Sequence, residues 1–181
     1  MPESAAFVAF LRGINVGGNK IVKMEDLRKA FESMGFGNVK TLLASGNVIF
    51  EAPQAPASAI AKRIEEKLEK TFGFSIGVIV RTKEDLRRLS DAQPFKGIKV
   101  TPETRLYVTF LSEKPKSGLK IPYKSPDGNF TILRATDTEV CSVLTISPDS
   151  RTVDLMGILE KEFGKKVTTR NWNTVTKLTA S

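Results

Sequence analysis

The chain has 181 residues, of which 40% are hydrophobic and 27% charged, and its formal net charge is +8. This length suits one large domain or two small ones, and the composition is typical of soluble globular proteins. No segment approaches the about 18–20 apolar residues that span a membrane, and no basic cluster precedes the first apolar run as in a secretion signal. The single cysteine, Cys141, excludes an internal disulfide. We therefore expect a cytoplasmic protein with no membrane attachment.

The absence of histidine excludes several kinds of site. Ser-His-Asp and Cys-His catalytic triads cannot be built, and neither can a zinc site that uses histidine or several cysteines. We predict no metal site and no cofactor. Acid–base chemistry would need a lysine or a carboxylate with a shifted pKa, or a metal held by oxygen ligands.

The basic balance, with a pI near 9.6, makes nucleic acid or a phosphorylated small molecule the partners to consider. The charge is scattered, however, and residues 62–70 mix both signs as an ordinary solvent-facing helix does. Residues 112–128 are rich in proline and glycine, which predicts a long loop. Its lysines are Lys114, Lys116, Lys120 and Lys124.

The first 82 residues predict strands and helices in the order βαββαβ. Apolar residues recur at helical spacing from Met24 to Met34 and from Ile60 to Phe72, and a glycine follows each run. Short apolar or β-branched runs predict the strands, of which the second and third form a hairpin. The predicted strands cover 7–11, 39–43, 48–50 and 74–80.

The remainder of the chain is less regular. Thr82 and Asp85 have the spacing of a capping box, and they predict a helix that ends before Pro94. A helix follows near residue 160, marked by Val153, Met156, Leu159 and Phe163. A last helix runs from Asn171 to Leu178, with Thr169 or Asn171 as its cap. The predicted strands cover 105–111, 130–135 and 139–146, with an extended segment at 167–169.

These patterns predict an α+β chain with two halves. The first, residues 1–82, has the order of the ferredoxin-like or split βαβ fold. Residues 83–104 form a helix and a connector. Residues 105–181 form a second, smaller α+β domain.

The glycine-rich segment 11–20, LRGINVGGNK, is the best indication of a site. It follows a strand and precedes a helix, and its glycines allow either a tight turn or a close approach of the backbone to an anion. A Walker A site is excluded, because Asn19 separates the second glycine from Lys20 and no hydroxyl follows for magnesium. The Rossmann pattern also fails. The candidate residues here are Arg12, Gly13, Asn15, Gly17, Gly18 and Lys20.

Topology brings a second loop to the same place. In a βαββαβ fold the first two strands run parallel, so their C-terminal ends lie at one edge of the sheet. The glycine-rich loop leaves from that edge, and so does the hairpin turn that contains Ser45, Gly46 and Asn47. We therefore predict that these two loops converge on a binding site.

A third polar cluster lies at 168–174, TTRNWNT. Trp172 could stack on a base or ring, but a core anchor that packs with Val175 and Leu178 is the more common role of such a residue. Arg170 and Asn171 are the better candidates for ligand contacts. Cys141 has no histidine to activate it, and we expect it to be a small buried residue.

Three segments together resemble one bacterial family, the domain of unknown function 1697. They are 11–20, the stretch GFGNVKTLLASGNVIF at 35–50, and TTRNWNTV at 168–175. Ala44 and Leu42 depart from the residues that members often carry at these positions. The resemblance implies a cytoplasmic α+β protein with a ferredoxin-like first half, and it supplies no activity or cofactor. The positions that it marks are Arg12, Gly13, Asn15, Gly17, Gly18, Lys20, Ser45, Gly46, Asn47, Arg170, Asn171, Trp172 and Asn173.

Three hypotheses remain open from the sequence. The first is a protein that binds a phosphorylated ligand or nucleic acid, with Arg12, Lys20 and Arg170 neutralising the phosphate while asparagines orient it. The second is a histidine-free enzyme for an anionic small molecule, with Lys20 as general acid or base. The third is a structural or partner-docking domain, in which the same polar residues are internal braces. We add the hypothesis that the cluster at 170–173 closes the site formed by the two loops.

Overall fold

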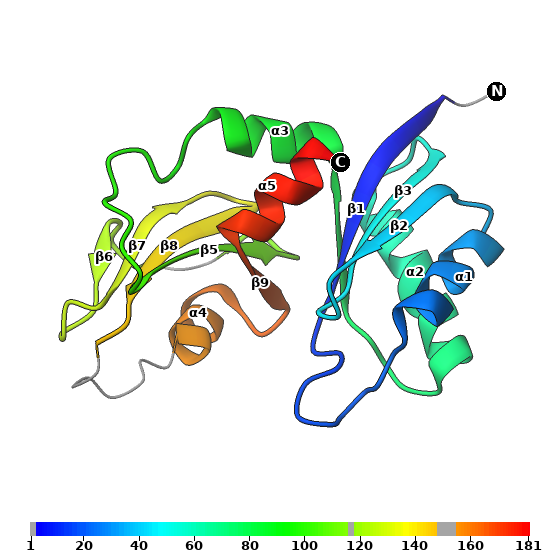
Figure 1. The fold of residues 1–181 in the computed structure, drawn as a ribbon, viewed down its shortest axis with the longest axis horizontal. Coiled ribbons are helices and arrows are strands. Elements are labelled where there is room, and N and C mark those ends of the chain that lie inside the picture. Colours follow the sequence, from blue (N-terminus) through cyan, green and yellow to red (C-terminus); the bar gives the residue numbers. More distant parts are fainter. Residues whose placement is uncertain (1–2, 116–117, 148–154) are drawn as a thin grey trace. The chain divides into compact units, whose positions relative to one another are not determined.

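The computed structural model describes residues 3–115, 118–147 and 155–181. The chain divides into two compact units, residues 1–87 and 88–181. The described residues form two antiparallel sheets and five helices, which confirms the α+β class (Figure 1). Lys116 and Val153, which the sequence places in a loop and a helix, lie outside the described residues.

The sheet of the first unit has the strand order β2-β3-β1-β4. β1 pairs antiparallel with β3 and β4, and β2 pairs antiparallel with β3. β1 and β2 therefore run in the same direction, and their C-terminal ends lie at one edge, as the sequence predicts. The elements are β1 (Ser4–Leu11), α1 (Met24–Ser33), β2 (Gly37–Leu42), β3 (Asn47–Pro53), α2 (Ala57–Phe72) and β4 (Val78–Thr82).

The core of this unit lies between the sheet and its two helices, which cover one face (Figure 1). Alternate residues of β1 point into it, because side chains of a strand alternate between faces. Phe50 stands at its centre, with ring centroids 5.6 Å from Phe7, 5.4 Å from Phe31 and 4.7 Å from Phe36. This aromatic cluster holds α1 against β1 and β3.

The predicted capping box is present where α3 (Lys83–Asp91) begins. The backbone N–H of Asp85 donates to Thr82 Oγ1 at 2.9 Å, and the Thr82 N–H donates to Asp85 Oδ2 at 3.1 Å. Two N–H groups at the start of the helix are thereby satisfied.

The sheet of the second unit has the order β6-β7-β8-β5-β9, and all its pairs are antiparallel. Helices α4 (Leu155–Phe163) and α5 (Trp172–Ala180) lie on opposite faces of this sheet (Figure 1). Helix α4 packs on a core that includes Leu111, Phe130 and Val167. The elements are β5 (Thr104–Leu111), β6 (Tyr123–Lys124), β7 (Phe130–Ala135), β8 (Glu139–Thr145), α4 (Leu155–Phe163), β9 (Val167–Asn171) and α5 (Trp172–Ala180).

Two sequence predictions are wrong: the start of the fourth strand, and the assignment of all of 112–128 to a loop. The fourth strand begins at Val78 rather than Phe74, because its partner β1 ends at Leu11, which pairs with Val78. Ile76 is buried in the core without pairing, so its apolar character reflects burial alone. The loop 112–128 contains the short strand β6. Asn171 occupies the N-cap position of α5 but makes no side-chain capping bond.

Candidate functional site

The glycine-rich loop folds back on itself as a small hairpin. The N–H of Asn19 donates to the carbonyl of Val16 at 3.0 Å, and the N–H of Asn15 donates to that of Lys20 at 3.1 Å. Gly17 and Gly18 at its tip have φ of +59° and +77°. Two successive residues of positive φ are what a type I′ hairpin turn requires, so these two glycines serve a turn.

The two loops meet at the sheet edge. Asn15 Nδ2 donates to the carbonyl of Ala44 at 2.8 Å and to that of Val22 at 2.9 Å, and Asn15 Oδ1 accepts the Val22 N–H at 2.8 Å. The N–H of Leu11 donates to the carbonyl of Gly46 at 2.8 Å. The predicted convergence is therefore present, and the Asn15 amide holds the two loops together.

The hairpin turn is anchored in the same way. Asn47 is fully buried, and its Nδ2 donates to the Leu42 carbonyl at 2.8 Å and to Ser45 Oγ at 3.2 Å. Gly46 is buried beside Ile14 and has φ of +90°. These contacts fix the shape of the turn from inside the protein.

Two cations lie on one short segment between α2 and β4. The backbone N–H of Arg12 donates to the Gly77 carbonyl at 2.9 Å, and a Cβ on Gly77 would lie 3.6 Å from Arg12 Cβ. Lys20 is exposed, and its Nζ donates to the carbonyl of Ser75 at 2.7 Å. Residues 75–77 therefore hold the backbone and the first side-chain carbons of Arg12 and the ammonium of Lys20, which come from different parts of the loop.

Arg170 and its neighbours belong to the second unit. Arg170 is only 8% exposed, and its Nη1 donates to Thr168 Oγ1 at 2.6 Å and to the Thr169 carbonyl at 3.1 Å. Burial lowers the pKa of Arg170 to about 10. The hydroxyl of Thr169 is 2.8 Å from that of Thr109 on the adjacent strand. This part of the predicted cluster is thus embedded in the sheet.

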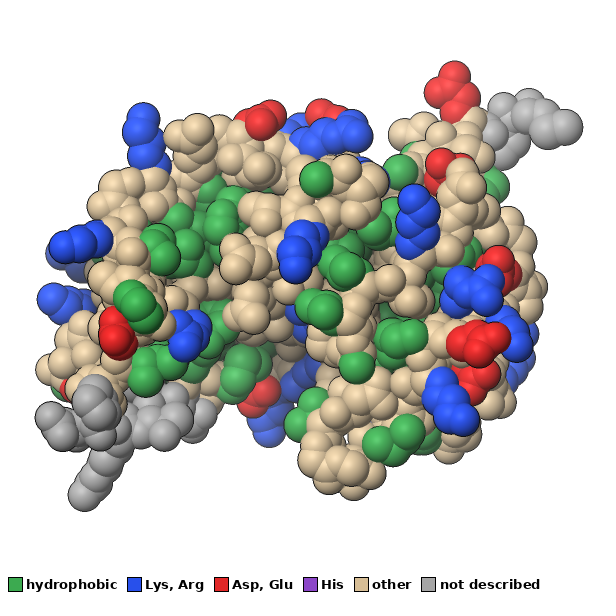
Figure 2. Space-filling model, in the orientation of Figure 1, with side chains coloured by type: hydrophobic (Ala, Val, Ile, Leu, Met, Phe, Trp, Pro, Cys, Tyr) green, Lys and Arg blue, Asp and Glu red, His purple; other side chains and the backbone are tan. Residues whose placement is uncertain are grey.

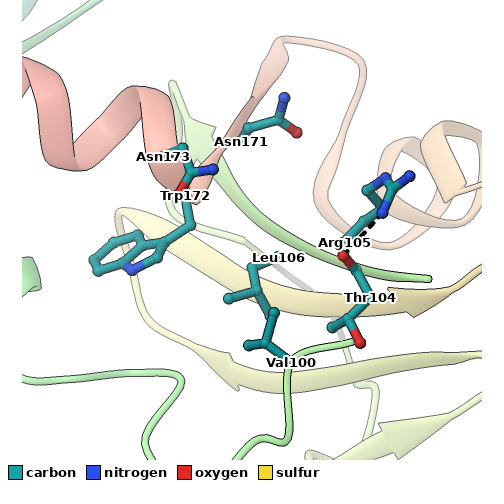
Figure 3. Close-up of a pocket in the computed structure, with 7 residues that line it drawn as sticks. All are labelled: Val100, Thr104, Arg105, Leu106, Asn171, Trp172 and Asn173. Carbon is teal, nitrogen blue, oxygen red and sulfur yellow. Dashed lines mark hydrogen bonds between the residues drawn. The ribbon is translucent and has the colours of Figure 1, made fainter. Parts of the chain in front are cut away.

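The next residues of this cluster line a hollow in the second unit (Figure 3). Its volume is about 330 Å³. Trp172 is half-buried, and its ring packs edge-to-face on Phe95 with centroids 5.2 Å apart. Trp172 is therefore both packed against the protein and exposed to the hollow. The lining residues are Val100, Thr104, Arg105, Leu106, Asn171, Trp172 and Asn173.

The contribution of Val100, Thr104, Arg105 and Leu106 to the hollow is not indicated by the sequence. These residues lie about 70 positions before Trp172, and only the pairing of β5 with β9 brings the two segments together. No local pattern in the sequence indicates that pairing.

One lysine of the chain, Lys83, is buried. The pKa of Lys83 is lowered by burial and, to a smaller extent, by the positive charges of Arg87 and Lys40. Lys20, the lysine that the enzyme hypothesis uses, is exposed, which removes burial as a means of activating it. Within the described ranges, no group of three or more acidic or cysteine side chains is placed to hold a metal ion.

Cys141 is fully buried, as predicted. Its thiol should therefore make the free energy of unfolding depend on pH in the alkaline range. Burial, assisted by the negative charge of Glu139, raises the pKa of Cys141 from an ordinary 9.0 to about 12. Below pH 9 the thiol is neutral in both states. Between pH 9 and 12 only the unfolded chain ionises, so the free energy of unfolding falls by at most about 1.4 kcal/mol per pH unit.

The measurement compares urea unfolding of the wild type and of Cys141→Ala from pH 8 to the alkaline limit of folding. We expect the stability difference between them to be constant below pH 9 and to shrink above it. Parallel curves throughout would show that the thiol is accessible to solvent.

The surface charge is mixed rather than gathered. Lys and Arg side chains are spread over the face seen in Figure 2, with Asp and Glu among them. Several exposed pairs lie within one helix, such as Arg28 with Glu32 at 2.9 Å. The net charge of +8 therefore does not by itself mark a binding face. Among the described residues, no helix combines the length and apolar character needed to cross a membrane.

Comparisons with known proteins give a family and a fold. Residues 5–140 match the family described as "Protein of unknown function (DUF1697)". The chain is similar to the solved structure of conserved bacterial protein SP0830 from Streptococcus pneumoniae, with 19% identity, a TM-score of 0.69 and 98% of each chain covered. An unknown protein from Galdieria sulphuraria gives 16% identity over 93% of this chain and 98% of that one, with a TM-score of 0.26. No curated protein matches the chain.

Proposed function

The chain belongs to the DUF1697 family, and from that premise we propose that it is a cytoplasmic binding protein for a phosphorylated or other anionic ligand, held at the glycine-rich loop. The observation that carries the proposal is that the Arg12 backbone and the Lys20 ammonium both bond to the single segment 75–77. Two neighbouring cations attract a phosphate group more strongly than either does alone. The order of elements and of strands supports a ferredoxin-like first unit as the scaffold.

Different residues of the two loops have different roles in this proposal. The amides of Asn15 and Asn47 hold the loops in shape through bonds within the chain. Nothing lies within 4 Å of the place where a Cβ would stand on Gly13, Gly17 or Gly18. The backbone of the loop is therefore open to a ligand that approaches from outside, with Arg12 and Lys20 supplying charge.

A second candidate, a structural or partner-docking domain, is favoured by one observation. The polar groups of Asn15 and Asn47 are directed into the protein, while three large apolar side chains at the same loops are more than half exposed. These are Val16, Ile21 and Leu43. Under this alternative, Arg12→Ala lowers the melting temperature, and the affinity of the protein for anions stays the same.

A thermal-shift screen of phosphosugars, nucleotides and short RNAs tests the proposal. A ligand present at 100 times its Kd should stabilise the wild type by about 2.7 kcal/mol. We expect this shift to disappear in Arg12→Ala and in Lys20→Ala and to persist in Lys62→Ala, which removes an exposed lysine from α2. An equal loss in all three variants, or no shift with any compound, would refute the proposal.

If the ligand is single-stranded RNA, the salt dependence gives a further check. Each phosphate contact contributes about −0.7 to the slope of log K against log salt. Removing both Arg12 and Lys20 should therefore make the slope shallower by about 1.4. A slope that is unchanged in the double variant would place the RNA elsewhere on the protein.

A further inference from the structure

We propose that the hollow at the end of β9 is a nucleotide-binding pocket, with the base against Trp172 and the phosphate at Arg105. All its lining residues belong to the second unit, so the proposal does not depend on the function assigned to the glycine-rich loop. A volume of about 330 Å³ lies at the lower end of the range for small-molecule sites.

The apolar wall of the pocket is held in place before any ligand binds. Phe95 is almost fully buried, and it supports the Trp172 ring at 5.2 Å with an interplanar angle of 62°. Leu106 and Val100 line the same hollow, to the right of the indole in Figure 3. A flat aromatic group could therefore lie in this hollow against Trp172, because any base has a face that stacks on an aromatic side chain.

The end of a strand ladder gives the pocket a backbone donor. The N–H of Leu111 donates to the Thr138 carbonyl and the Glu103 carbonyl accepts from Ile146, so the odd-numbered residues of β5 bond toward β8. By the alternation of an antiparallel strand, Leu106 points its N–H to the β9 side. The pairing on that side ends at Tyr107 with Asn171, and the chain then turns into α5.

Two residues of β5 in this register, Thr104 and Leu106, lie past the end of the ladder, and the Thr104 N–H donates to the Thr101 carbonyl at 3.0 Å. The edge that remains at Leu106 is too short for a peptide to add as a strand. It is enough for one acceptor atom of a base. The amides of Asn171 and Asn173 lie at the rim and add donors and acceptors (Figure 3).

Arg105 supplies the charge on the opposite side of Leu106 from Trp172 (Figure 3). Its Nη1 donates to the carbonyls of Pro102 at 2.7 Å and Thr104 at 3.1 Å. Both acceptors are neutral, so these bonds orient the guanidinium without cancelling its charge. A guanidinium has five N–H donors in a planar fork, and the remaining ones suit phosphate oxygens. Arg105 and Leu106 are neighbours on β5 and point to opposite faces, so a nucleotide would reach both the indole and this guanidinium by passing the strand edge that is open beyond Asn171.

The chain offers a direct probe, because Trp172 is its only tryptophan. We expect AMP to change the fluorescence of the intact protein saturably, with Kd below about 1 mM. Adenosine should bind more weakly, and ribose 5-phosphate should leave the fluorescence unchanged. No saturable change with AMP up to about 10 mM would overturn the proposal. Ribose 5-phosphate binding as tightly as AMP would also overturn it, since the base would then contribute nothing.

Two variants assign the roles. Arg105→Gln should weaken AMP binding roughly 10- to 100-fold and leave adenosine unchanged, since it removes a charged hydrogen bond to phosphate. Lys177→Gln, which removes an exposed charge from α5, is the matched control and should bind AMP normally. Equal affinities of these two variants would overturn the placement of the phosphate.

Because variants at Trp172 lose the fluorescence signal, calorimetry is used to measure how much the base contributes to binding. Trp172→Ala should weaken both AMP and adenosine about tenfold, and Trp172→Phe should restore most of the affinity because it keeps a ring. Unchanged affinity in Trp172→Ala would overturn the placement of the base. Arg12→Ala should leave AMP binding at this pocket intact, so failure of the glycine-rich loop as a site and failure of this pocket give different results.

Discussion

Replacing Asn47 with Asp is expected to lower the free energy of unfolding by about 3–5 kcal/mol at neutral pH, the range for an uncompensated buried charge. The two side chains have nearly the same shape, so packing is preserved. Asn47 is fully buried, however, and its Nδ2 donates to the Leu42 carbonyl at 2.8 Å. An ionised Asp would place a negative oxygen against that carbonyl oxygen and would lose the bond.

The loss should depend on pH with a definite sign. Burial and the facing carbonyl would raise the pKa of the new carboxyl above its ordinary value of about 3.9. A group whose pKa is raised on folding is best tolerated below its unfolded pKa and becomes costly as the pH rises through the folded value. The variant should therefore be closer to the wild type at about pH 4 than at about pH 7.

Urea unfolding at both pH values measures this effect. Asn19→Asp is the control, because Asn19 is exposed in the neighbouring glycine-rich loop. It should change stability by less than about 0.5 kcal/mol. An equally small effect of Asn47→Asp would mean that the Asn47 amide reaches solvent, and a role in orienting a ligand would regain support.

The topology of the first unit was predictable because the local signals in its sequence agree with one another. Helical spacing, glycine stops and the hairpin turn all indicate one order of elements, and the order alone places the two loops at one edge. What the sequence could not predict is the direction of the amides. An asparagine at a turn bonds either to the chain or to a ligand, and only the positions of the Val22 and Ala44 carbonyls decide that for Asn15.

The second unit shows a different limit of what can be predicted from the sequence. The sequence singles out Trp172 and Asn171, and both line the hollow, but Arg170 next to them is buried in the sheet. Alternation along a strand puts neighbours on opposite faces, and the sequence does not say which face is covered. Arg105 was missed altogether, because its role depends on where the pairing of β5 and β9 stops.

Gly46→Ala is expected to destabilise the protein by about 3 kcal/mol through two independent effects. Gly46 has φ of +90°, a conformation that costs an L-residue about 1–2 kcal/mol. A Cβ at this position would also lie 2.8 Å from Leu11 Cβ and 2.8 Å from Ile14 Cδ1. Ile14 is a side-chain tip that could turn away, but Leu11 Cβ is fixed to the central strand. Overpacking of this kind adds about 1–3 kcal/mol.

Gly17→Ala separates the two effects. Gly17 has φ of +59°, and no atom lies within 4 Å of its Cβ position, so only the backbone term applies, about 1–2 kcal/mol. The difference between the variants in urea unfolding therefore measures how tightly the hairpin turn packs on β1. That packing holds the turn beside Arg12, at the base of the glycine-rich loop. If both variants lose the same free energy, the turn can withdraw from Leu11 at no cost, and the two loops do not form one rigid wall for a ligand.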